Sequence, residues 1–199
     1  MIDERFYSTL TAVFVVTAIS ISIFFRSRAT MRSEETYRQK QGGPGLIAIR
    51  LTFALSMVSF LVAYAVNPAW VNWASMGLPD WLRIAGGALV LIAIPNFVWM
   101  FRHLGKNITP TADTRTDHTL VVSGPYRWVR HPLYTVAIAF WLGISLFTAK
   151  WILLGLVGLM VVFLMIRTPR EEANLLERFG DEYRDYRSRT GRYIPKLFG

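Results

Sequence analysis

The stretch that organises this chain is residues 118–134, which read HTLVVSGPYRWVRHPLY. Its Gly124-Pro125 pair indicates a turn, and the aromatic residues that follow flank basic side chains. Pro132 then opens an apolar run that continues to Phe147, and proline is favoured at the first position of a helix. Polar, aromatic and basic side chains therefore stand at the start of a hydrophobic helix, where water meets a membrane.

The composition of the whole chain indicates a membrane protein. Of 199 residues, 53% are hydrophobic and only 18% are charged, which is too apolar for an ordinary soluble domain of this length. The absence of cysteine excludes disulfides, thiol nucleophiles and cysteine metal sites. The net charge of +9 favours membrane lipids with anionic headgroups as partners and no nucleic acid, because the cations interrupt hydrophobic runs and form no single basic face.

Five apolar runs predict an all-α, polytopic integral membrane protein with about five transmembrane helices, since a helix needs ~20 residues to cross a bilayer. They are residues 7–25, 46–66, 81–101, 132–147 and 151–166. The last two are short and only residues 148–150 separate them, so we expect a tight helical hairpin. The first run is long for a signal peptide and has no small-residue cleavage site before Arg26, which favours an uncleaved anchor.

Basic residues set the expected orientation of these helices. Positive charge crowds the loop between the first two runs, at Arg26, Arg28, Arg32, Arg38 and Lys40. Only Arg5, Arg83 and Lys150 fall on or near the other side, so the positive-inside rule places the N-terminus outside and the C-terminus in the cytoplasm.

The C-terminal residues predict one more helix. Between residues 168 and 189, Leu175, Phe179, Tyr183 and Tyr186 recur at helical spacing with charges between them. This pattern predicts an amphipathic cytoplasmic helix, followed after Gly191 by a tail that folds back toward the membrane surface.

Two separated motifs carry a family resemblance. GPYRWVRHPLY at residues 124–134, followed by RTPREEANLLERFGDEYRDY from Arg167, resembles the isoprenylcysteine carboxyl methyltransferases and related membrane phospholipid methyltransferases. The agreement of both motifs in order and spacing is more specific than either alone. The resemblance implies one membrane methyltransferase domain over residues 1–199, with variable membrane spans in 1–101 and the cofactor-binding and catalytic region in 102–199.

The resemblance also implies a cofactor, S-adenosylmethionine, and an active site on the cytoplasmic side. It assigns Glu171 to the cofactor and Arg167 to the substrate, with both as catalytic residues. The other cofactor-binding residues that it implies are His118, Thr119, Leu120, Val121, Tyr126, His131, Pro132, Leu133 and Tyr134. Aromatic rings suit this ligand, because they pack on adenine and attract a sulfonium cation by ~0.5 to 2 kcal/mol.

Several of these residues also have purely structural interpretations. His131 is compatible with an interfacial residue at the start of a helix whose first position is Pro132. If a helix continues through Pro169, Arg167 and Glu171 form an ordinary ion pair four residues apart. Alternatively, residues 168–171 fit a capping box that starts a helix at Thr168.

The roles of two further charged residues stay open. Arg50 either extends to the headgroups from the cytoplasmic end of its helix or faces the interior to pair with a carboxylate. Glu172 has no assigned role beyond that of a possible base. His103, His118 and His131 lack the compact spacing of a metal motif, so we expect no metal site.

The leading functional hypothesis is transfer of a methyl group from S-adenosylmethionine to the carboxylate of a lipophilic or lipidated substrate, as the resemblance implies. Transfer to a phospholipid amine or to a thiol is the alternative. A sterol-reductase-like, NADPH-dependent membrane enzyme and a catalytically inactive lipid-binding protein are further hypotheses. The sequence sets neither the physiological acceptor nor the oligomeric state.

Overall fold

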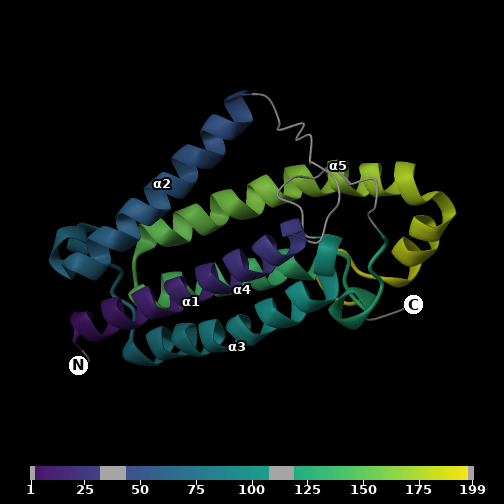
Figure 1. Cartoon of the computed structure of the whole chain (residues 1–199). Helices are drawn as coiled ribbons and strands as arrows, with labels where there is room; N and C mark the ends of the chain where they lie inside the picture. Colours follow the sequence, from purple (N-terminus) through teal and green to yellow (C-terminus); the bar gives the residue numbers. More distant parts are fainter. Residues whose placement is uncertain (1–2, 32–43, 108–118, 197–199) are drawn as a thin grey trace. The chain divides into compact units, whose positions relative to one another are not determined.

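The computed structural model describes residues 3–31, 44–107 and 119–196. These residues form five α-helices and no strand (Figure 1). The helices are α1 (Glu4–Met31), α2 (Pro44–Val66), α3 (Asp80–Leu104), α4 (Pro132–Thr148) and α5 (Trp151–Arg189). Short 3-10 segments add η1 (Pro68–Ala74), η2 (Gly105–Asn107) and η3 (Gly124–Arg127). Each predicted apolar run lies in one helix, which confirms the all-α prediction.

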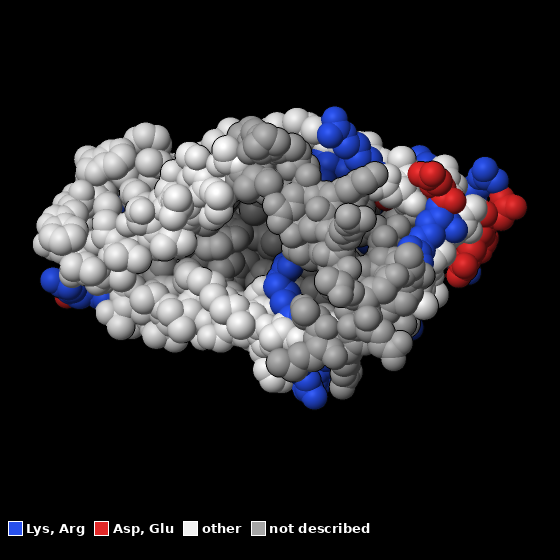
Figure 2. All heavy atoms as spheres, turned by 45° about the horizontal axis from the view of Figure 1, so that its top comes forward, with Lys and Arg blue, Asp and Glu red and all other residues white. Residues whose placement is uncertain are grey.

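Three of the helices, α1, α3 and α5, are long and apolar enough to cross a membrane. Helix α4 and the Leu51–Val66 part of α2 are apolar but shorter. Only 17% to 33% of the residues in the three long apolar stretches are buried, as expected of helices whose side chains face lipid. White, uncharged atoms cover long stretches of the face drawn in Figure 2. The chain is thus a helical integral membrane protein, while the count of five crossings stays a prediction.

The chain forms two compact units. Unit 1 comprises Met1–Ile19, Gln41–Ile94 and Ile138–Val161, and unit 2 comprises Ser20–Lys40, Pro95–Ala137 and Val162–Gly199. Every predicted site residue belongs to unit 2. The predicted division at residue 101 stays a prediction.

In unit 1, glycines let two helices approach closely. A Cβ atom added to Gly86 of α3 would lie 2.7 Å from the carbonyl oxygen of Gly143 in α4, and one added to Gly143 would lie 2.7 Å from that of Gly86. Small residues at a crossing permit such backbone contact, which stabilises helix pairs in lipid. The ring of Phe147 fills the adjoining space, with its centroid 5.0 Å from that of Tyr7 and 5.7 Å from that of Phe14.

In unit 2, aromatic packing joins α1 to α3. The ring of Phe25 stacks on that of Phe101 at 5.6 Å, beside the buried Ala29. Gly124, which opens η3, has φ +58° and lies so close to the His103 ring that any Cβ would clash with it. The predicted turn at residues 124–125 therefore requires glycine for both its conformation and its space.

Helix α5 corrects one interpretation of the C-terminal region. It continues without interruption through Thr168 and Pro169, so no helix begins at Thr168 and the capping-box interpretation of residues 168–171 is wrong. The Thr168 hydroxyl instead donates to the Leu164 carbonyl at 2.7 Å, inside the helix. Pro169 is tolerated because its ring lies on the exposed side of α5. The geometry breaks later, at Gly180 with φ 52°, and Tyr183 and Tyr186 beyond it are buried.

The tail after Arg189 folds back onto residues 128–131. The Gly191 N–H donates to the Trp128 carbonyl at 3.0 Å, and the Gly191 carbonyl accepts from Arg130 N–H at 2.9 Å. The His131 N–H donates in turn to the Arg192 carbonyl at 3.0 Å. A Cβ at Gly191 would collide with the Ile194 carbonyl oxygen, so this return of the chain also requires glycine.

Candidate functional site

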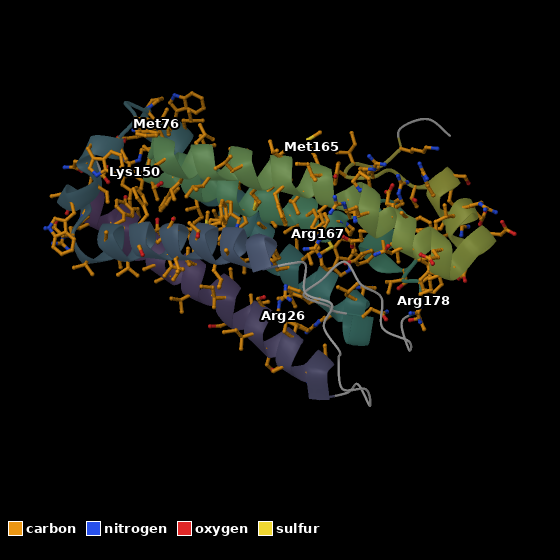
Figure 3. All side chains as sticks on the ribbon, turned by 90° about the horizontal axis from the view of Figure 1, so that it is seen from above. Arg26, Met76, Lys150, Met165, Arg167 and Arg178 are labelled. Carbon is orange, nitrogen blue, oxygen red and sulfur yellow. The ribbon has the colours of Figure 1, made fainter. Side chains whose placement is uncertain are left out.

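Residues of the two sequence motifs meet between the first turn of α4 and the middle of α5. The Tyr134 hydroxyl donates to Glu171 Oε2 at 2.5 Å, and Arg167 Nε lies 3.6 Å from the same oxygen. The Arg167 and Glu171 side chains are 19% and 24% exposed, so both remain accessible to a ligand. Because the helix continues through Pro169, the i,i+4 pair exists as one of the predicted alternatives requires (Arg167 is labelled in Figure 3).

Arg167 has unused hydrogen-bonding capacity. Its Nε is buried and has no hydrogen-bond partner among the described residues, whereas buried donors are normally paired. Its Cζ lies 6.0 Å from the centre of the Tyr134 ring. A guanidinium held in this way can donate to a carboxylate or phosphate of a ligand.

His131 lies beside this group as a buried aromatic wall. Its ring stacks on Tyr134 with centroids 5.4 Å apart and planes at 6°, and it lies 6.1 Å from the Tyr193 ring. Its Nε2 is 3.4 Å from Glu172 Oε1, which is an electrostatic contact without the geometry of a hydrogen bond. His131 does precede the first residue of α4, as its structural interpretation requires, and its role in cofactor binding stays a prediction.

Tyr126 belongs to the same surroundings. It is buried in η3, and its carbonyl accepts from the Tyr186 hydroxyl at 2.7 Å. Burial raises the pKa of Tyr126, and the nearby Tyr186 and Glu171 act in the same direction.

The remaining predicted residues are less directly tied to Glu171. Pro132 is buried and Leu133 half-buried at the start of α4. Thr119 exchanges two hydrogen bonds with the buried Asn107, at 3.1 and 3.2 Å. Leu120 and Val121 follow it half-buried, and in the described ranges no hydrogen bond or ring contact joins residues 119–121 to Arg167 or Glu171. His118 lies outside the described residues.

Glu172 is the most heavily bonded carboxylate of unit 2. Its Oε1 accepts from Arg130 Nε at 2.9 Å and from Arg192 Nε at 3.3 Å, and its Oε2 accepts from Arg192 Nη2 at 2.9 Å. Burial alone would raise its pKa, but the facing nitrogens of His131, Arg192 and Arg130 together hold the pKa of Glu172 well below its usual range. Glu172, which follows the apolar run of α5, is therefore ionised, and both of its oxygens accept hydrogen bonds from arginines.

Sequence analysis missed Arg130, Arg192 and Tyr193. Arg130 stands inside the quoted motif, where its basic character was noted without a role. The signal for Arg192 and Tyr193 was the predicted return of the tail after Gly191, which brings both residues to the site. The contact of Asn107 with Thr119 could not be predicted from the sequence, because a single amide side chain in a polar segment belongs to no motif or periodicity.

Comparison with known proteins identifies the family. The family model described as phospholipid methyltransferase matches residues 81–182, slightly more than half of the chain. Rat protein-S-isoprenylcysteine O-methyltransferase is 30% identical over 164 residues, which cover 73% of this chain and 57% of the relative. Methanethiol S-methyltransferase 2 of Bradyrhizobium diazoefficiens is 29% identical, over 99% of this chain and 79% of the relative.

A solved structure supports the same fold. The eukaryotic intramembrane Ras methyltransferase ICMT (isoprenylcysteine carboxyl methyltransferase) matches with a TM-score of 0.55 and 19% identity, covering 94% of this chain and 68% of that one. The chain thus has the helical arrangement of an intramembrane methyltransferase, although it spans only 57% of the length of the rat relative. Since the family model includes η3, α4 and α5 as far as residue 182, the chain belongs to the phospholipid methyltransferase family.

Proposed function

We propose that this protein is an S-adenosylmethionine-dependent methyltransferase that acts on the carboxylate of a lipophilic acceptor. The observation that carries the proposal is the convergence of Glu171, Arg167 and Tyr134 around one carboxylate oxygen. The predicted catalytic pair is thereby combined with aromatic rings from a separate motif. The family assignment favours methyl transfer over the reductase hypothesis.

The described residues fit the proposed cofactor. S-adenosylmethionine supplies a methyl group on a sulfonium when it is bound. The partly exposed Glu171 offers that cation a negative charge, and the rings of Tyr126, His131 and Tyr134 offer aromatic faces.

Arg167 favours an acceptor carboxylate. Its guanidinium, on a side chain that is 19% exposed, can hold one carboxylate oxygen and so orient the other toward the methyl donor. A carboxylic acid with an ordinary pKa near ~4 is ionised at neutral pH, so the acceptor needs no general base. The enzyme's task is then mainly to position two reactants, for which Arg167 and Glu171 suffice.

Methyl transfer to a thiol is the second candidate, because the methanethiol S-methyltransferase relative matches over 99% of this chain. A thiol must lose its proton before it attacks, so this reaction requires a base. Both oxygens of Glu172 already accept hydrogen bonds from arginines, which leaves Glu171 as the available carboxylate.

One experiment separates the two acceptors. Purified protein is incubated with methyl-labelled S-adenosylmethionine and, in parallel, with a farnesylcysteine analogue, a small alkyl thiol or phosphatidylethanolamine. We expect label in the farnesylcysteine analogue that base treatment releases as methanol, because an ester hydrolyses whereas a thioether or a methylated amine does not. Base-stable label in the thiol would select the second candidate. Absence of S-adenosylmethionine binding would contradict both.

We also propose five membrane crossings, with residues 168–189 of α5 as its amphipathic part on the cytoplasmic side and the site facing the cytoplasm. The asymmetry of Lys and Arg along the sequence supports this topology. Because the chain has no cysteine, Lys40→Cys and Trp73→Cys can be labelled singly in sealed membranes. We expect labelling from opposite sides, and labelling of both from one side would contradict the five-crossing topology.

A further inference from the structure

The C-terminal tail contacts the candidate site at several points that methyl transfer itself does not require. Its backbone pairs with residues 128–131 through three hydrogen bonds, at 2.9 to 3.0 Å. Those residues lead directly into His131 and α4. The tail is therefore placed to control how the aromatic wall of the site is held.

Glu172 and two arginines fasten this pairing. Glu172 is 4% exposed and accepts from Arg130 on one side and from Arg192 of the tail on the other. Arg130 Nη1 also donates to the Arg187 carbonyl at 3.1 Å and to the Thr190 carbonyl, so the same guanidinium holds the end of α5. We call Glu172, Arg130 and tail residues 190–193, which include Arg192, the C-terminal clamp.

The clamp also brings an aromatic side chain to the site. The Tyr193 hydroxyl donates to Thr168 Oγ1 at 2.8 Å, and the Tyr193 carbonyl accepts from Thr135 Oγ1 at 2.6 Å. These bonds join the tail to both α5 and α4. They hold the Tyr193 ring 6.1 Å from that of His131, which in turn stacks on Tyr134.

We infer that Glu172 and Arg192 are positioning residues that set the affinity for S-adenosylmethionine by holding Tyr193 and His131 in place. The inference rests on the proposed function, since it takes the His131–Tyr134 pair as part of the cofactor site. Neither oxygen of Glu172 is available to a ligand, because Arg130 and Arg192 occupy both. Glu172 therefore acts through the tail, while Glu171 acts on the ligand.

The test uses Arg192→Gln with Arg189→Gln as its matched control. Arg192 is 41% exposed, so its replacement leaves no buried cavity. Arg189, three residues before Arg192, pairs with Asp185 at 3.3 Å on the exposed surface of α5. No side-chain hydrogen bond or ion pair joins it to a clamp residue in the described part of the chain. Hydrogen exchange by mass spectrometry follows the amides of residues 130, 131 and 191, and calorimetry measures S-adenosylmethionine affinity.

We expect Arg192→Gln to exchange these amides faster and to bind S-adenosylmethionine roughly tenfold more weakly, because it loses a charge-assisted contact. KM for S-adenosylmethionine should rise while kcat is retained, since Arg192 makes no hydrogen bond or ion pair with Arg167 or Glu171 in the described part of the chain. Arg192→Lys keeps the charge and should recover part of the affinity. Arg189→Gln should change neither measurement.

Unchanged exchange in Arg192→Gln would overturn the clamp. Faster exchange with unchanged affinity would overturn its link to the cofactor. If the wild-type protein binds no S-adenosylmethionine, the proposed function fails together with the cofactor half of the inference, and the exchange data still decide whether the clamp exists.

Discussion

Each unit contains a cluster of charged side chains around a glutamate, and the two clusters differ in what their cations contact. In unit 1, Glu4 Oε1 accepts from Arg83 Nη1 at 2.8 Å and lies near Lys150, whose Nζ is 4.0 Å from Oε2. Lys150, labelled in Figure 3 at the turn between α4 and α5, also donates to Ser75 Oγ at 2.7 Å. In unit 2, the corresponding pair is Arg167 and Glu171.

The surroundings of the two arginines separate structure from binding. Arg83 lies flat on the Tyr7 ring, with Cζ 3.4 Å from its centroid, and its Nε donates to the Phe147 carbonyl at 3.1 Å. Protein atoms thus occupy its face, its Nε and its Nη1, while its Nη2 is buried without a hydrogen-bond partner among the described residues. Arg167 is 6.0 Å from the Tyr134 ring and its Nε has no hydrogen-bond partner among the described residues. The Glu4 cluster thus joins helix ends, whereas on the proposed function the Glu171 cluster receives a ligand.

The largest expected effect comes from breaking the Glu4 cluster. Glu4→Gln leaves the buried Arg83 and Lys150 without a counterion and should lower the free energy of unfolding by about 3 kcal/mol. This is the lower end of the range for a buried pair, because the Glu4 side chain is 38% exposed. Thermal unfolding in detergent measures the loss, and calorimetry on the folded fraction should show unchanged S-adenosylmethionine affinity.

The matched control is Asp181→Asn, which removes the exposed ion pair with Arg184 and should alter stability by less than about 1 kcal/mol. A Glu4→Gln protein that unfolds like the wild type, or that binds the cofactor more weakly while folded, would break the distinction between the two clusters.

The helices could be predicted because apolar length is a local property. All five runs became helices. Arg5, Arg83 and Lys150, the cations predicted for one side of the membrane, lie in unit 1, while the orientation in the membrane stays a prediction. Glu4, the common partner of Arg83 and Lys150, was not predicted. An ion pair between residues 4 and 83 depends on how helices pack, and no periodicity within either segment encodes that.

The candidate site was predictable where a motif places neighbours on one helix or at its start. Arg167 and Glu171 share a face of α5, and Tyr134 meets Glu171. The error at Thr168 arose because proline usually marks the first turn of a helix, whereas Pro169 lies inside α5 on its exposed side. The return of the tail after Gly191 was predicted, but its contact with residues 128–131 also depends on the bend at Gly180, which sequence spacing does not reveal.

Substitutions of Arg167 and Glu171 should have the next largest effect. Unlike Glu4→Gln, they should lower turnover and leave the stability of the fold nearly unchanged. Glu171→Gln removes the charge that faces the sulfonium, and Arg167→Lys replaces a planar donor by a point charge. Each should lower turnover roughly ten- to a hundredfold or more, with melting temperature nearly unchanged. Initial rates of methyl transfer, measured beside melting curves, decide this. Wild-type turnover in both variants would contradict the assigned roles.

The smallest expected effect offers the sharpest comparison, because each cluster contains a tyrosine that donates to its glutamate. The Tyr134 hydroxyl donates to Glu171 at 2.5 Å, and the Tyr64 hydroxyl donates to Glu4 at 3.0 Å. Tyr134→Phe keeps the ring stacked on His131 and removes only this bond. It should weaken S-adenosylmethionine binding about two- to tenfold, the equivalent of one ordinary hydrogen bond.

Tyr64→Phe removes the same group from the other cluster, so it should lower the melting temperature slightly and leave the affinity unchanged. If Tyr134 acts through Glu171, its substitution should have no further effect on affinity in a Glu171→Gln background, because the carboxylate that it orients has lost its charge. Additive effects would instead mean that the Tyr134 hydroxyl contacts the cofactor directly. Equal losses of affinity in Tyr64→Phe and Tyr134→Phe would show that both clusters act by stabilising the fold, and the contrast between Arg83 and Arg167 would then carry no functional meaning.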